Sequence, residues 1–229
     1  MSSETGQGLF ATAITFDELK LLIFAALISY MAGSVMGGHW AGRIFGIDLR
    51  KRGSGNLGAT NALRNLGWAP GLLVFAIDVG KALAAVWVVK AYVAPQCFQC
   101  EPLVVAISFL AVVLGHMFPL WHEFSGGKGV ATFFGGLVPI SGYAVLVAIL
   151  VWLQIATSTG YVSVASMMAV AAAAVMIAIF FGPTNTVFLL VLFTALLVIW
   201  AHRSNIRKLN AGTEHQMKQL LLRKSKTKS

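Results

Sequence analysis

Three polar, glycine-rich segments interrupt an otherwise apolar chain and hold residues able to do chemistry. They read "RKRGSGNLGATNALRNLG" (50–67), "GHMFPLWHEFSGGKGVAT" (115–132) and "HRSNIRKLNAGTE" (202–214), here called the first, second and third polar segments. Each combines small or hydroxyl-bearing residues with arginine, lysine or histidine. Such donors and cations suit an anion, particularly a phosphate, which arginine grips with two hydrogen bonds. We therefore expect the three segments to form one composite site.

The first polar segment offers hydrogen-bond donors without a carboxylate among its candidate ligands. We expect a short helix over 57–66, capped by Ser54 or Asn56 and ended by Gly67. On that helix Thr60 and Arg64 are four residues apart and share a face. The candidate anion-binding residues are Ser54, Asn56, Thr60, Asn61 and Arg64. The alternative is a capped loop helix that lies in the lipid headgroups.

The second polar segment contains "SGGKG" at 125–129, in which three glycines surround Lys128. Glycine lets the backbone approach an anion closely, and the helix expected from about Val130 aims its positive amino end at the loop. The loop is not a Walker A motif, which requires Gly where His122 stands and Ser or Thr where Gly129 stands. The alternative is a flexible hinge between two membrane helices.

The third polar segment extends the last apolar stretch and places His202 and Asn205 on one helical face. A lone interfacial histidine is more often a structurally satisfied polar residue than a catalyst, so this segment depends on its neighbours. Ser166 and Ser163, at the start of an apolar stretch, either face the site or pack against another helix. Asp78 and Lys81 lie three apart inside an apolar stretch, and a structural ion pair is the favoured interpretation.

The composition predicts the elements that must position these residues. The 229-residue chain is 58% hydrophobic and 11% charged, with a mean hydropathy of +0.80, whereas soluble domains carry about 25% charged residues. The chain is therefore predicted to be an all-α, polytopic membrane helical bundle. We expect one domain over 1–229, with 1–18 and 215–229 as flexible termini. The apolar stretches are 19–42, 68–93, 103–119, 130–140, 142–158, 162–181 and 184–201.

These stretches give about seven transmembrane helices, with five or six as the alternative because 130–140 is short for a span of about 20 residues. With the N-terminus outside, Lys and Arg concentrate on one side together with all three polar segments, which places that side and the C-terminus in the cytoplasm. The net charge of +9 then indicates contact with anionic membrane lipids rather than nucleic acid. Cys97 and Cys100 fall on the outer side, either as a disulfide or as two free thiols.

The three segments, in this order and together with the Asp78-x-x-Lys81 pair, resemble the motifs of the bacterial PlsY acyltransferases. The resemblance covers nearly the whole chain. It implies a seven-helix enzyme of the bacterial cytoplasmic (inner) membrane, with its active site facing the cytoplasm. The implied reaction transfers a fatty acyl group from acyl phosphate to the 1-hydroxyl of glycerol 3-phosphate, giving lysophosphatidic acid and inorganic phosphate. The substrate's own phosphate would act as the base, and neither metal nor cofactor is expected.

The resemblance also assigns site residues. Ser54, Lys128, His202 and Asn205 are expected to be catalytic. Substrate is expected to contact Ser54, Asn56, Thr60, Asn61, Arg64, Gly126, Gly127, Lys128, Gly129, His202, Asn205 and Glu214. Ser166 is added to this set because of its place at the start of an apolar stretch, not because of the resemblance. One departure is "IRKL", where the family often has Arg at the position of Lys208, and the two side chains are not equivalent at a bidentate contact.

Two other functions fit less well. A transporter of an anionic or phosphorylated solute would favour polar groups at mid-membrane, whereas the polar segments gather at one surface. A metal-dependent phosphotransferase needs clustered aspartates, and Asp17, Asp48 and Asp78 are far apart in the chain. No histidine is followed five residues later by aspartate, the pattern of coenzyme-A-dependent acyltransferases.

Overall fold

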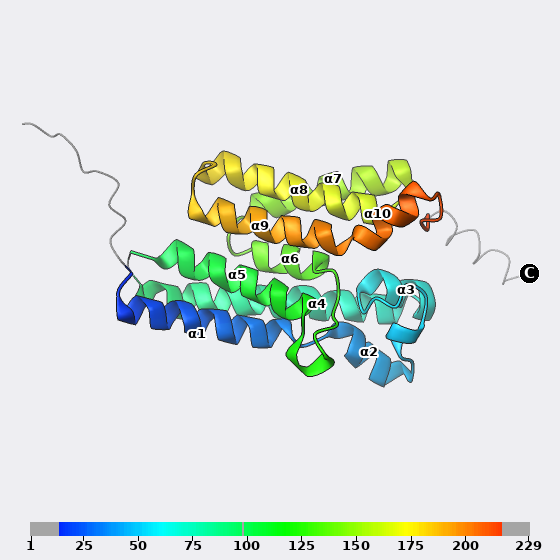
Figure 1. Cartoon of the computed structure of the whole chain (residues 1–229), viewed down its shortest axis with the longest axis horizontal. Helices are drawn as coiled ribbons and strands as arrows, with labels where there is room; N and C mark the ends of the chain where they lie inside the picture. The colour runs from blue at the N-terminus through cyan, green and yellow to red at the C-terminus, as the bar shows by residue number, and fades with distance from the viewer. Residues whose placement is uncertain (1–13, 98, 217–229) are drawn as a thin grey trace, which may run out of the picture.

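The computed structural model describes residues 14–97 and 99–216, and within them all regular structure is helical. The helices are α1 (Phe16–Gly33), α2 (Gly37–Phe45), α3 (Ala59–Leu66), α4 (Trp68–Val88), α5 (Glu101–Met117), α6 (Val130–Leu137), α7 (Gly142–Thr159), α8 (Val162–Phe181), α9 (Thr186–Ala201) and α10 (Arg203–Asn210). A π-helical turn, Val89–Val93, extends α4. The predicted all-α class is confirmed (Figure 1).

Five helical stretches of the described chain are long and apolar enough to cross a membrane, and α9 and α10, bent by 50°, would make a sixth if taken as one span. This agrees with the predicted polytopic bundle and with the alternative of five or six spans. The count of seven remains a prediction. Its weak member is α6, because eight residues rise only about 12 Å, against about 30 Å of hydrocarbon.

The helices pack in two groups joined by α5 and α6 (Figure 1). One group contains α1, α4, α5 and α6, the other contains α7, α8 and α9, and α5 contacts both α1 and α9. Glycines allow α1 and α5 to approach closely: a Cβ added to Gly33 would lie 2.2 Å from the Val112 carbonyl oxygen. Phe109 of α5 packs edge-on against Phe133 of α6 in the fully buried core. These contacts fix the end of α5 from which the second polar segment emerges.

The apolar stretch predicted over 19–42 lies within one candidate membrane span, Phe16–Phe45, but it consists of two helices and not one. The chain breaks after α1 and restarts as α2 at Gly37. Side chains of α4 satisfy backbone groups freed by the break: Gly37 N–H donates to Asp78 Oδ1 at 3.2 Å, and Lys81 Nζ donates to the Val35 carbonyl at 2.6 Å. Buried backbone groups must be paired, and here charged side chains do it.

The N-terminal boundary of the fold lies earlier than expected. Residues 16–18 belong to α1, although 1–18 was predicted to be flexible. A capping box stabilises this start, with Thr15 and Glu18 each satisfying the other's backbone N–H. At the other end, 215–216 follow the last helix without regular structure. The rest of the predicted flexible termini, 1–13 and 217–229, lies outside the described residues.

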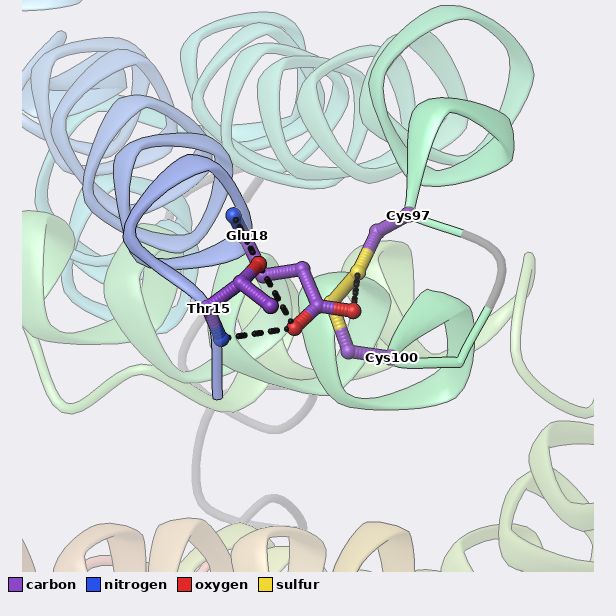
Figure 2. The surroundings of a disulfide bond; sticks show 4 residues. All are labelled: Thr15, Glu18, Cys97 and Cys100. Carbon is purple, nitrogen blue, oxygen red and sulfur yellow. Dashed lines mark hydrogen bonds between the residues drawn. A yellow bond between two sulfur atoms is a disulfide. The ribbon is translucent and has the colours of Figure 1, made fainter. Parts of the chain in front are cut away.

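The two ends of the bundle differ in chemistry. The first polar segment, the α5–α6 connection and α10 lie at the same end, as predicted (Figure 1). At the opposite end Cys97 and Cys100 form a disulfide, with Cα atoms 5.2 Å apart. Figure 2 shows Glu18 between the disulfide and the start of α1, with its Oε1 3.6 Å from Cys97 Sγ and its Oε2 accepting from Thr15 N–H at 2.9 Å. Of the two alternatives for these cysteines, the structure shows the disulfide.

Candidate active site

The first polar segment folds around Asn61 rather than around a capping residue. Asn61 is 4% exposed, its Nδ2 donates to the carbonyls of Leu49, Arg52 and Asn56 at 3.2, 3.1 and 2.8 Å, and its Oδ1 accepts from Ser54 N–H at 3.1 Å. The amide of Asn61 is therefore used to hold the loop.

The predicted cap of α3 is wrong, because Gly58 occupies that position without a side-chain bond. Asn56 instead closes a turn before it, with Oδ1 accepting from Gly58 N–H at 2.8 Å. The predicted end of α3 is confirmed, since Gly67 stops it with φ of 95°. Ser54 lies exposed on the loop, whereas Thr60 and Arg64 are partly buried on α3.

The glycines of the second polar segment are required by close packing. Gly126 and Gly127 donate their N–H groups to the carbonyls of Met117 and His116 at 3.2 and 3.1 Å. A Cβ on Gly127 would lie 2.2 Å from His116 Nε2. These two amides are thus engaged within the protein. The loop ends at Gly129, the residue before α6, which has a φ of 86° in the left-handed region that favours glycine.

The start of α6 is the part of the loop suited to an anion. Its first i→i−4 bond runs from Phe133 N–H to the Gly129 carbonyl at 2.7 Å. The amides that precede Phe133 at the start of the helix have no intrahelical partner and carry the positive end of its dipole. Lys128 stands immediately before this helix start.

A chain of hydrogen bonds joins Lys128 to the third polar segment. Lys128 Nζ donates to Asn205 Oδ1 on α10. Asn205 Nδ2 donates to Glu214 Oε1 at 2.7 Å, and Ser163 Oγ of α8 donates to the same oxygen at 2.8 Å. Glu214 is 8% exposed. Residues of α8 and α10 therefore meet at one buried carboxylate after α10, and Asn205 links it to Lys128 in the loop before α6.

The serine that reaches this chain is Ser163, not Ser166. Ser166 Oγ instead accepts from Trp152 Nε1 of α7 at 3.2 Å, which ties α7 to α8. Both serines start the same helix, and the sequence alone does not show which of them faces Glu214. The packing alternative for Ser166 is thus the one that its contact supports.

His202 sits at the bend between α9 and α10, where it is 3% exposed. Its Nδ1 is 2.8 Å from the Val198 carbonyl, which can only accept, so Nδ1 carries the hydrogen. In the neutral ring Nε2 is then left as an acceptor. Electrostatic interactions link His202 to Lys128 and Glu214.

Positive charge exceeds negative charge at this site. Burial lowers the pKa of Lys128 to about 8, against the opposing effect of Glu214, and Lys208 and Arg64 lower it further. Burial also lowers the pKa of Arg64, while Glu214 raises it. Three cations thus surround one carboxylate. Within the described part of the chain, the buried Nε of Arg64 has no hydrogen-bond partner. A bound anion would balance the positive charge and accept a hydrogen bond from Arg64 Nε.

An ionic cluster lies next to the loop 125–129, here called the glycine loop. Lys81 Nζ is 3.0 Å from Asp78 Oδ1 and 2.9 Å from His116 Nδ1, and all three side chains are buried. The expected ion pair is therefore present, and His116 joins it, although the sequence alone does not indicate this. His116 stands within the second polar segment, but only the fold shows that its ring supports Gly127.

Comparison with known proteins agrees with these observations. A family model described as glycerol-3-phosphate acyltransferase matches residues 23–212. Glycerol-3-phosphate acyltransferases of Aquifex aeolicus and Thermus thermophilus are 39% identical over 194 residues and 40% identical over 198 residues. Each alignment covers 85% of this chain, and 98% and 94% of the two relatives.

Two solved structures of PlsY, an integral membrane glycerol 3-phosphate acyltransferase, have a similar fold. The glycerol 3-phosphate form has a TM-score of 0.77 and 37% identity, over 85% of this chain and 94% of that one. The lysophosphatidic acid form has a TM-score of 0.77 and 35% identity, over 88% and 98%. The chain therefore belongs to the glycerol-3-phosphate acyltransferase family, the one that its three polar segments resemble.

Proposed function

We propose that this membrane enzyme transfers a fatty acyl group from acyl phosphate to the 1-hydroxyl of sn-glycerol 3-phosphate. The products are lysophosphatidic acid and inorganic phosphate. Membership of the family supports the acyl acceptor, and solved relatives are described in glycerol 3-phosphate and lysophosphatidic acid forms. The observation that carries the proposal is the cationic cluster of Arg64, Lys128 and Lys208, with an unpartnered donor on Arg64.

Two phosphate groups must lie close together in this reaction, one on each substrate. Arg64 and Lys128 are proposed to bind phosphate directly, assisted by the helix dipole at the start of α6. Asn205 and Glu214 hold the Lys128 ammonium in place, so we assign them a positioning role. Asn61 shapes the loop that presents Ser54 and Asn56 to the substrate, and Thr60 is presented by α3. His202 offers Nε2 as an acceptor for a substrate hydroxyl.

The chemistry requires no nucleophile from the enzyme. The 1-hydroxyl oxygen attacks the acyl carbon, an ester bond forms, and the bond from that carbon to the phosphate oxygen breaks. Inorganic phosphate leaves with the bonding electrons, and the hydroxyl proton passes to the phosphate of glycerol 3-phosphate as base. Catalysis then depends on orientation of the two substrates and on cations that stabilise the departing phosphate.

The site is proposed to face the cytoplasm of a bacterial inner membrane. The end of the bundle that carries it also carries α2 and the α2–α3 connection (Figure 1). These segments contain Arg43, Arg50, Lys51 and Arg52, which suits the cytoplasmic side. Both proposed substrates would reach the site there. The transporter alternative receives no support from this placement, because the cations gather at one end.

The assay uses purified protein, acyl phosphate and glycerol 3-phosphate, with release of inorganic phosphate as the measurement. We expect phosphate release only when both substrates are present, and no turnover with acyl coenzyme A in place of acyl phosphate. Release no greater than that of Lys128→Ala would reject the proposed reaction. Turnover with acyl coenzyme A instead would retain the acceptor and reject the donor.

A further inference from the structure

A cavity lined by basic residues, distinct from the proposed active site, opens beside α2. It has a volume of about 240 Å³ and is lined by α2 and the loop that follows it, including His39, Arg43, Asp48 and Arg50. Neither Arg64 nor Lys128 lines it. The acyl transfer proposed above uses none of these four residues.

The side chain of His39 has an unsatisfied hydrogen-bonding atom. Its Nε2 is buried and has no hydrogen-bond partner within the described residues. The ring is held by stacking on His122, with centroids 3.5 Å apart and planes inclined by 24°. Buried polar atoms without a partner are uncommon in folded proteins, so this one indicates a bound group that the protein does not supply.

The charges around the cavity indicate that the bound group is an anion. Arg43 and Arg50 line it, and both interact electrostatically with His39. Asp48 lines it too, but its Oδ1 is occupied by Arg50, accepting from the backbone N–H at 3.0 Å and from Nε at 3.3 Å. Two guanidinium groups and one carboxylate therefore line the cavity, and the balance of charge is positive.

The surroundings of α2 indicate where the anion comes from. Trp40, Ile44 and Phe45 are exposed on this short helix, and the Arg43 guanidinium lies 6.0 Å from the centre of the Trp40 ring. In a membrane protein such a helix lies at the interface, with its apolar side chains against lipid and its arginines at headgroup level. We propose that the cavity binds the phosphate of an anionic phospholipid headgroup, with His39 Nε2, Arg43 and Arg50 as its donors.

The test is a titration of the purified full-length protein in neutral detergent, with native mass spectrometry of bound phosphatidylglycerol and, separately, phosphatidylcholine. We expect preferential binding of phosphatidylglycerol. Arg43→Gln and Arg50→Gln should each weaken it roughly tenfold or more, because each removes a charge-assisted hydrogen bond. His39→Phe, which retains a stacking ring without Nε2, should weaken it as well.

Lys51→Gln is the matched control, because it removes one charge from the same exposed loop but does not line the cavity. It should bind phosphatidylglycerol as the unaltered protein does. Equal weakening by Lys51→Gln would show general attraction to basic loops and overturn the proposal, as would equal binding of phosphatidylcholine. Displacement of the lipid by inorganic phosphate at the same concentration would show a site for free phosphate and reject the lipid.

Discussion

At the scale of single residues, substitution of Lys128 distinguishes a phosphate-binding loop from a simple hinge between helices. Lys128→Met should lower kcat by about 10²–10³, because it removes a preorganised donor from the developing phosphate anion. Arg64→Lys should lower activity too, since an ammonium cannot reproduce the two-pronged contact of a guanidinium. The measurement is phosphate release at saturating substrates, with Lys20→Met as a control on an exposed lysine at the other end of the bundle. Near-normal turnover of Lys128→Met would leave the hinge as the correct interpretation.

The ionisation of Lys128 predicts a pH dependence. Its pKa is lowered to about 8, so the ammonium is present below this pH and is lost as the pH rises through it. We expect kcat/KM to fall over that range. Glu214 raises the pKa of Lys128, so Glu214→Gln should move this fall to lower pH, while its amide oxygen still accepts from Asn205 and Ser163. The substrates titrate identically with both enzymes, so an unchanged profile would contradict the role of Lys128.

At the scale of elements, Asp78 connects the α1–α2 break to α4. Asp78→Asn would leave the buried Lys81 without its counter-ion, and breaking a buried pair costs about 3–5 kcal/mol. The matched control is Asp17→Asn, because Asp17 and Lys20 have the same spacing, but their side chains are 88% and 59% exposed against 1% and 7% for Asp78 and Lys81. An exposed pair contributes about 0–1 kcal/mol. Thermal unfolding should show a much larger loss of Tm for Asp78→Asn, and equal losses would refute the structural role.

Hydropathy predicts the helices of this chain well but not their interruptions. Long apolar runs such as 162–181 have only one way to satisfy their backbone in lipid, and the run is α8. The break after Gly33 depends on Asp78 and Lys81, which lie more than 40 residues away and donate or accept only once α4 is in place. Sequence spacing within the first stretch contains no trace of that contact.

The candidate site shows the same division. Lys128, Asn205 and Glu214 were expected together, and hydrogen bonds join them. Which of Ser163 and Ser166 faces Glu214 depends on how α8 is rotated against α7. Asn61 binds loop carbonyls because the loop folds back onto its side-chain amide. His116 was missed because its partners come from α4 and from the glycine loop. Tertiary packing, which a single sequence does not reveal, decides all of these.

At the scale of the whole molecule, the charge distribution predicts an orientation in the membrane. Cysteines introduced as Ser125→Cys and Asn210→Cys should react with a membrane-impermeant maleimide only after the cytoplasmic face is exposed. Cys97 and Cys100, once reduced, should react in intact cells, because they lie at the opposite end of the bundle. Labelling of Ser125→Cys in intact cells would invert the orientation. The basic residues near the site are the physical basis of this prediction.

The central claim is transfer of the acyl group from acyl phosphate to glycerol 3-phosphate by attack at the acyl carbon, with phosphate as the leaving group. It is tested most directly with acyl phosphate carrying ¹⁸O in the oxygen that joins carbon to phosphorus, followed by mass spectrometry of both products. Attack at the acyl carbon predicts that the label appears in inorganic phosphate and that lysophosphatidic acid contains none. Label recovered in a fatty carboxylate, or no lysophosphatidic acid at all, would contradict the account.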